Sequence, residues 1–267
     1  MKSFKVMFVL LYILLSSIPL YSSESSCGTT SSVMTNSIPL TGTIRAYFVF
    51  VQFRDDSQAS TEWPLNTYPA WANNFVNATA GGTYPYPNIS HYYNEMSNGA
   101  FQVIGDVYDN LVITNLNQSQ YTSIGEVNRE VLSRIDPDVN FALYDNLTGT
   151  SWGSDGIVDL VFMIYRNVTS ETLMYYTGIA HLEMSSTYTT NDGVSIQNYN
   201  YIGGGVQMRG GWNGRDYSTY IAAHELGHYL FGGGHIDFMS NLGLMTGRPY
   251  WNDDRGMCAW EGDILAG

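Results

Sequence analysis

Two apolar runs along the chain have the pattern of strands that are buried on both faces. The first, from residue 44 to 53, reads IRAYFVFVQF, and the second, from 157 to 165, reads IVDLVFMIY. Neither run shows the regular polar alternation of a strand with one face in water. We therefore predict two central strands of one sheet.

Helical patterns lie between and after these runs. Residues 89–96 predict a short helix that ends at Asn98-Gly99, a typical helix stop. Apolar residues between 121 and 135 recur at helical spacing and predict a second helix. The segment 101–114, FQVIGDVYDNLVIT, alternates in short pieces around a Tyr-Asp-Asn turn, which predicts a hairpin.

The N-terminus has the layout of a secretory signal peptide. Lys2 and Lys5 precede an apolar run, and small polar residues follow it. The run is short for a membrane span, although a retained N-terminal anchor is the alternative. We predict a signal peptide over residues 1–23, a Ser/Thr-rich leader over 24–43, and the folded domain over 44–267.

Charge and composition narrow the kinds of partner. The chain has 24 Asp plus Glu against 11 Lys plus Arg, a formal net charge of −13. This balance would repel a nucleic-acid backbone and an anionic membrane, so we expect neither as a partner. Surplus carboxylates also suit hard cations such as calcium. We expect a secreted monomer without a membrane span in its mature form, and the sequence leaves open whether Cys27 and Cys258 pair.

The densest chemistry lies in the segment YSTYIAAHELGHYLFGGGHIDF, which begins at Tyr217. Ser218 or Thr219 is expected to cap a helix over residues 220–231, and the three glycines at 232–234 are expected to stop it. The motif HELGH therefore lies inside a helix.

His224 and His228 are four residues apart, so their imidazoles project from one face of this helix and can bind one ion. Neutral imidazole nitrogen is a good zinc ligand, at about 2.0–2.1 Å. Glu225 lies off the metal axis but within reach of a water molecule on the ion, where a carboxylate can act as general base. Zinc needs a third protein ligand, and we predict His235, which follows the glycine turn.

Two other interpretations of the motif stay open. A core helix can contain two histidines by chance, and a metal site can serve stability without catalysis. Three of the five histidines fall in this short segment, within an apolar helix and beyond a glycine exit. That combination favours a catalytic metal site.

The motif resembles that of the metzincins, HExxHxxGxxH followed by a methionine turn, but HELGHYLFGGGH places the third histidine one position late. The chain is more similar to the M6 family of secreted bacterial metallopeptidases, the immune inhibitor A type. SHYYNEMSNGAFQVIGDVY (90–108) looks like that family's tyrosine-rich helix followed by Ser-x-Gly and a strand. DGIVDLVFMIY (155–165) looks like its central strand, and Met245 in NLGLMTG looks like its Met-turn.

This resemblance implies an α/β (α+β) zincin-like peptidase domain, with a twisted mixed sheet over the HExxH helix. Because the spacing departs from the metzincin pattern, the third ligand is either His235, which we predict, or Asp237 as the alternative. Tyr250, just past the turn, is either an aid to the oxyanion or an ordinary tyrosine. Since a zincin normally continues with a lower subdomain, we expect that the chain, which ends at Gly267, is truncated at its C-terminus.

A second metal is an open question. Asp155 and Asp159, with Asp145 and Asn146 upstream, are either remnants of a calcium loop or ordinary loop residues, because the dense Asp-x-Asp-Gly pattern of strong calcium sites is missing.

The sequence thus predicts a secreted zinc endopeptidase that hydrolyses protein or peptide substrates, with Glu225 as general base and no covalent intermediate. A catalytically silent extracellular metal-binding or adhesive module is one alternative. A zinc hydrolase of non-peptide amides or esters is the other.

Overall fold

The computed structural model describes residues 38–81, 88–148, 151–197, 204–232, 235 and 244–245. The predicted signal peptide, most of the leader, the C-terminal end and the residues Cys27, Cys258, Asp237 and Tyr250 lie outside these ranges. None of the described helices is long and apolar enough to cross a membrane.

The described chain alternates between strands and helices. The strands are β1 (Gly42–Gln52), β2 (Phe101–Val107), β3 (Val112–Ile113), β4 (Leu147–Thr148), β5 (Ser151–Trp152), β6 (Leu160–Tyr165), β7 (Gly178–Ile179), β8 (Tyr188–Thr189), β9 (Ser195–Ile196) and β10 (Gly204–Met208). The α-helices are α2 (Ile89–Met96), α3 (Ile124–Ile135) and α4 (Arg215–Phe231), and the 3-10 helices are η1 (Ala72–Asn74), η2 (Gln118–Gln120), η3 (Phe141–Tyr144) and η4 (Gly211–Asn213).

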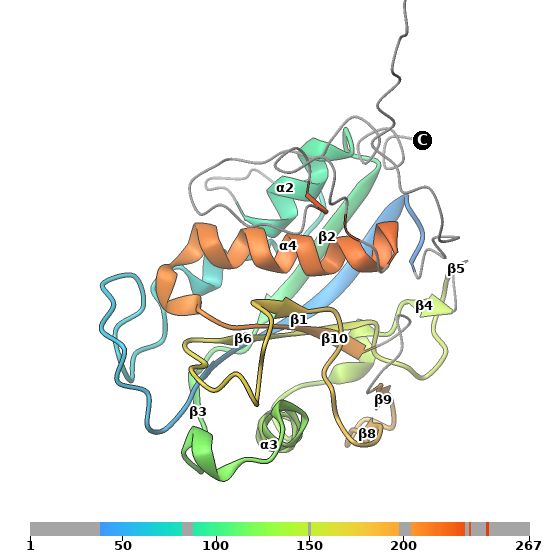
Figure 1. Ribbon diagram of the computed structural model, residues 1–267. Coiled ribbons are helices and arrows are strands. Elements are labelled where there is room, and N and C mark those ends of the chain that lie inside the picture. Colours follow the sequence, from blue (N-terminus) through green and yellow to red (C-terminus); the bar gives the residue numbers. More distant parts are fainter. Residues whose placement is uncertain are drawn as a thin grey trace, which may run out of the picture.

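A mixed sheet forms the central layer of this α/β fold. Its strand order is β2-β1-β6-β10-β7, and β3 also pairs with β1. β1 runs parallel to β2, β3 and β6, and β10 runs parallel to β6, whereas β7 at the edge runs antiparallel to β10. Figure 1 shows α2 and α4 on one face of this sheet and α3 on the other.

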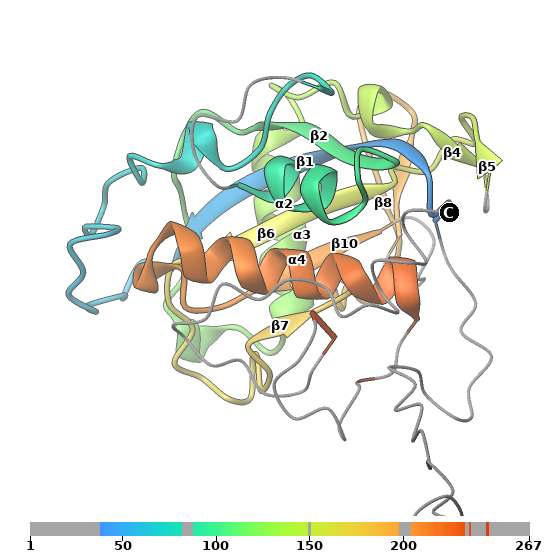
Figure 2. The ribbon, with the colours of Figure 1, turned by 90° about the horizontal axis from the view of Figure 1, so that it is seen from above.

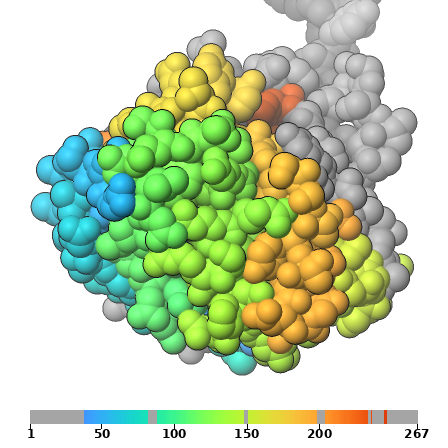
Figure 3. Space-filling model, turned by 90° about the horizontal axis from the view of Figure 1, so that it is seen from below, coloured from blue at the N-terminus to red at the C-terminus, as the bar shows by residue number. Residues whose placement is uncertain are grey.

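Side chains of the central strands alternate between two core clusters. Phe48 of β1 and Phe162 of β6 stack at 4.5 Å in the cluster under α2 and α4. Val49 and Met163 point the other way, into the cluster against α3. On that side, the segments of α3 and of β8 and β9 cover the lower face of the molecule (Figure 3). Burial on both faces confirms the two central strands that the apolar runs predict.

The two short helices lie where the sequence predicts them. α2 is capped by Asn88, whose side chain accepts a hydrogen bond from the His91 N–H at 2.8 Å, and the chain leaves the helix through Asn98 with φ 56°. α3 begins after Ser123, whose hydroxyl accepts from the Glu126 N–H at 3.2 Å. Local capping chemistry therefore sets these helix starts.

The predicted hairpin over residues 101–114 is wrong. β2 and β3 both pair with β1 in parallel, through Phe48 with Val107 and Val51 with Val112. Residues 108–111 bulge out between these two pairings, and the chain does not reverse. Alternation along a segment predicts strand structure but not the direction in which the partner runs, because that direction depends on distant residues.

A buried ion pair anchors the long loop after β1. The guanidinium of Arg166 donates to the Asp56 carboxylate, to the Trp63 carbonyl oxygen at 2.8 Å and to the Gln58 carbonyl oxygen at 2.6 Å. The side chains of Arg166 and Asp56 are both 0% exposed. The loop therefore closes around a charge that water cannot solvate.

Replacing Asp56 with Ala leaves this buried charge unpaired, and we expect a loss of about 3–5 kcal/mol in the free energy of unfolding. Urea denaturation measures it. Asp216→Ala is the matched control, because Asp216 pairs with Arg215 at the surface, where the Asp216 side chain is 85% exposed. There we expect about 1 kcal/mol or less, and equal losses in the two variants would contradict the prediction.

Candidate metal centre

Helix α4 carries the HELGH motif and lies beside α2, over the sheet (Figure 2). The Tyr93 hydroxyl of α2 donates to the Ala223 carbonyl oxygen at 2.7 Å. The Tyr229 hydroxyl of α4 donates to the carbonyl oxygens of Ala180 at 2.8 Å and Gly205 at 2.9 Å. Buried tyrosines thus tie the helix to both of its neighbours, one bond lying next to His224 and the others next to His228.

The start of α4 differs from the sequence prediction. The helix begins at Arg215 after the N-cap residue Gly214, and no side chain caps it. Ser218 lies one turn inside, where its hydroxyl donates to the Gly214 carbonyl oxygen at 2.8 Å, and Thr219 is also interior. The apolar pattern begins only after this polar first turn, which explains why the sequence predicted a helix start several residues after the observed one.

The end of α4 agrees with the sequence. Gly232 is the C-cap, with φ 92°, and its N–H donates to the His228 carbonyl oxygen at 3.1 Å. A positive φ of this size favours glycine, so the first glycine after the motif ends the helix.

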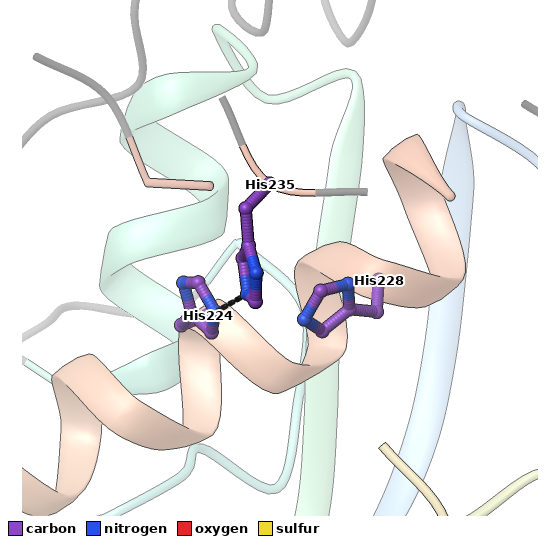
Figure 4. Close-up of side chains that lie close together, drawn as sticks. All are labelled: His224, His228 and His235. Atoms are coloured by element: carbon purple, nitrogen blue, oxygen red, sulfur yellow. Dashed lines mark hydrogen bonds between the residues drawn. The ribbon is translucent and has the colours of Figure 1, made fainter. Parts of the chain in front are cut away.

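His224, His228 and His235 converge on one point (Figure 4). One ring nitrogen from each lies within 4.8 Å of the other two, and the Nε2 atoms of His224 and His235 are 3.1 Å apart. His224 and His228 come from one face of α4, while His235 points toward them from a separate segment that lies across from this face. His224 and His228 are buried, as in the core-helix interpretation, but a core helix does not require a third imidazole to meet them.

Backbone carbonyls fix the orientation of the two helical imidazoles. Nδ1 of His224 lies 2.7 Å from the Leu244 carbonyl oxygen, and Nδ1 of His228 lies 3.1 Å from the Gly232 carbonyl oxygen. A carbonyl oxygen can only accept, so each Nδ1 carries the proton and donates it. In the neutral ring the Nε2 lone pair is then free to bind a metal ion.

Burial also keeps these two rings neutral. It lowers the pKa of His224 to about 3, helped by neighbouring imidazoles, and the pKa of His228 to about 4. Metal ions bind neutral imidazole, so the rings hold the form that a ligand needs.

The three nitrogens fit a zinc ion. Tetrahedral zinc with Zn–N distances of about 2.0–2.1 Å places its nitrogen ligands about 3.3 Å apart. One observed separation, 3.1 Å between the Nε2 atoms of His224 and His235, is close to this value, and the others are at most 4.8 Å. Small rotations of the side chains would complete the geometry. The group could therefore hold a metal ion such as zinc.

Glu225 lies beside this group but is not one of its members. Its Oε2 atom is 3.9 Å from Nε2 of His228, and only 5% of the residue is exposed. Burial raises the pKa of the Glu225 carboxyl to about 8. The carboxylate is thus a strong base held next to the point where the imidazoles meet.

The segment of Met245 packs against the same part of the helix. Met245 is 1% exposed, and its sulfur would lie 2.4 Å from a Cβ atom added at Gly227. The preceding residue, Leu244, supplies the carbonyl that orients His224. The sequence gave no signal for the roles of the Leu244 and Gly232 carbonyls, because a backbone acceptor leaves no mark in the residue type.

In the described part of the acidic loop before β6, the carboxylates accept hydrogen bonds from the backbone of the loop. The Asp145 carboxylate accepts the N–H groups of Asp155 at 2.9 Å and Gly156 at 2.8 Å, and Asp159 accepts that of Asn146 at 2.8 Å. Across the described ranges, the only cluster of three or more His, Cys, Asp or Glu side chains that could hold a metal is the histidine group. The carboxylates organise the loop itself, as ordinary loop residues do.

The fold and site together define a mixed α/β protein with a three-histidine group that could bind a metal on its last described helix. No protein-family model matches the chain, and a search of curated proteins found no match.

We expect the chain to bind one zinc ion and His235→Ala to lose stoichiometric binding, because two imidazoles alone leave the ion underligated. Zinc at 100 times its Kd should stabilise the parent by about 2.7 kcal/mol and raise its Tm, and this shift should vanish in the variant. His91→Ala, on α2 outside the group, is the control and should behave like the parent. Full retention of zinc without His235 would instead point to Asp237 as the third ligand.

Asp159 makes stability depend on pH. Its pKa is about 3.9 in an unfolded chain, and burial raises it to about 8 in the fold, so between these values the folded state holds a proton that the unfolded state has lost. The stabilising contribution is complete below about pH 4 and is lost as the pH rises through about 8, with a slope of up to about 1.4 kcal/mol per pH unit. Urea unfolding at acidic and neutral pH should show a smaller slope for Asp159→Asn than for the parent. A slope in Asp159→Asn equal to that of the parent would be against the prediction.

Proposed function

We propose that this protein is a zinc-dependent endopeptidase of the zincin type, similar to the M6 metallopeptidases. The observation that carries the proposal is the buried Glu225 carboxylate, 3.9 Å from the Nε2 atom of His228. A zinc site that serves only stability is usually closed by a fourth protein ligand and needs no base beside it. Within the described residues, the group contains three histidines and no Cys, Asp or Glu.

The chemistry divides between the ion and the chain. When bound, the ion supplies Lewis acidity where the three imidazoles meet. The Glu225 carboxylate takes a proton from the water molecule whose oxygen attacks the carbonyl carbon of the peptide bond. As the C–N bond breaks, the same carboxyl group returns that proton to the leaving nitrogen. The products are a carboxylic acid and an amine, and no bond to the protein forms.

Two features of the site suit Glu225 to this role. Burial strengthens its affinity for a proton, as its raised pKa of about 8 shows. A cation held by the adjacent histidines favours the ionised carboxylate, which can then accept a proton. The hydrogen bonds to Leu244 and Gly232 hold the imidazoles still while the proton moves.

The proposal extends to location and substrate. The signal-peptide pattern in residues 1–23 supports export, and the net charge of −13 argues against a nucleic acid as substrate. The similarity to the M6 type favours proteins and peptides over other amides.

Glu225→Gln tests the role of the base, because the amide keeps the size of the side chain but cannot take the proton. We expect hydrolysis of casein or of a fluorogenic peptide library to fall by about 10²–10⁴-fold while zinc content stays at one ion per chain. Glu95→Gln, on the exposed side of α2, is the matched control and should keep parental activity.

The other outcomes separate the alternatives. Zinc in the parent without cleavage of any peptide would overturn the peptidase proposal and favour a binding module. Cleavage of esters or non-peptide amides alone would assign the site to another class of zinc hydrolase. Equal activity of parent and Glu225→Gln would remove Glu225 from the mechanism.

A further inference from the structure

Gly178 lies directly against the side chain of Glu225. It belongs to β7, the edge strand that pairs with β10 through Met208 and Gly178. A Cβ atom added to Gly178 would lie 2.4 Å from Oε1, 2.6 Å from Cγ and 2.7 Å from Cδ of Glu225. Carbon atoms in favourable contact are about 3.5–4.0 Å apart, so a side chain at position 178 and the present position of Glu225 exclude each other.

The backbone of Gly178 does not itself require glycine. Gly178 is not among the glycines with positive φ, and its strand conformation is open to any residue. The close contact with Glu225 is therefore the reason why position 178 must be a glycine in this structure.

Strand β7 cannot easily move back to make room. On one side of Gly178, the Arg209 N–H donates to the Thr177 carbonyl oxygen at 2.9 Å, and the Arg209 guanidinium donates to the carbonyls of Met174 at 2.8 Å and Tyr175 at 3.0 Å. On the other side, Tyr229 holds the Ala180 carbonyl at 2.8 Å. A larger residue at 178 would displace the carboxylate more readily than the strand.

The two oxygens of the Glu225 carboxyl group face different neighbours. Oε1 is the atom nearest to the position of a Cβ at residue 178, and Oε2 is 3.9 Å from Nε2 of His228. The carboxylate is thus held between the edge strand and the histidine group. A side chain at position 178 would push the carboxylate away from β7 and so change its position relative to the imidazoles.

We propose that Gly178 is a positioning residue: it determines the position of the Glu225 carboxylate relative to the metal ligands. The catalytic part of this inference rests on the proposed function, because the exact position of the carboxylate matters for the rate only if Glu225 is the general base. Gly178 contributes no functional group; it acts by leaving space.

A double-mutant cycle on the full metal-free chain tests the contact without any assay of activity. Gly178→Ala is introduced into the parent, into Glu225→Gln and into Glu225→Ala, and thermal unfolding is measured for all six proteins. We expect the substitution to lower Tm by about 5 °C in the parent and in the isosteric Gln background. In the Ala background the opposing side chain is gone, and the loss should disappear. If Gly178→Ala fails to fold alone, recovery of folding with Glu225→Ala is the same result.

Equal losses in all three backgrounds would overturn the inference, because position 178 would then press on something other than the Glu225 side chain. Ile179→Ala is the control: it lies on the same strand, but its side chain packs in the cluster on the other face of the sheet. Its effect on Tm should be independent of residue 225.

Kinetics and metal binding test the positioning role. Gly178→Ala should bind zinc with parental affinity, because the three atoms nearest to the new methyl group all belong to Glu225 and none to a histidine, while kcat falls about 100-fold and KM changes little. A parental kcat with an intact stability cycle would overturn the inference, since the carboxylate would then tolerate displacement. A parent that cleaves no peptide is a failure of the proposed function, and the stability cycle distinguishes that result from a failure of the contact.

Discussion

Burial of helix α4 is the constraint on which the site depends. The helix takes His224, Glu225 and His228 into a layer between the sheet and its neighbours, where each is less than a tenth exposed. A buried polar group without a partner costs about 1–3 kcal/mol, so each imidazole must be neutral and paired. The pairing with backbone carbonyls uses the Nδ1 protons and leaves the Nε2 lone pairs facing His235. A cation at that point would bind three such lone pairs at once, so metal binding would stabilise the folded state.

The sheet supplies the rigidity that this arrangement needs. The parallel strands β1, β6 and β10 are buried on both faces and fix the plane on which α4 rests. Among the described strands of this sheet, only β7 runs antiparallel to its neighbour, β10. Its backbone lies against the helix. Arg209 and Tyr229 then hold that backbone from two sides. The carboxylate of Glu225 is thus confined by a strand and by its own helix.

Local patterns predicted the elements whose causes are local. The bounds of α2 follow from its cap and its Asn-Gly stop, and the two apolar runs became β1 and β6. The convergence of His224 and His228 follows from helical spacing. Sequence patterns did not predict the features that depend on distant residues. β3 pairs in parallel with β1 because β1 is long enough to pair with both β2 and β3. The polar first turn of α4 is helical because the rest of the helix is buried. The short strands β7 and β10 contain glycines, and their place in the sheet comes from their neighbours.

The carbonyls of Leu244 and Gly232 orient two histidines through the path of the main chain. Any amino acid at position 244 presents the same oxygen, so the hydrogen bond to His224 does not depend on which apolar side chain fills the core there. Mutational drift would therefore erase similarity around the site faster than it erases the site. A chain can keep such a centre while sequence comparison no longer connects it with others that share it.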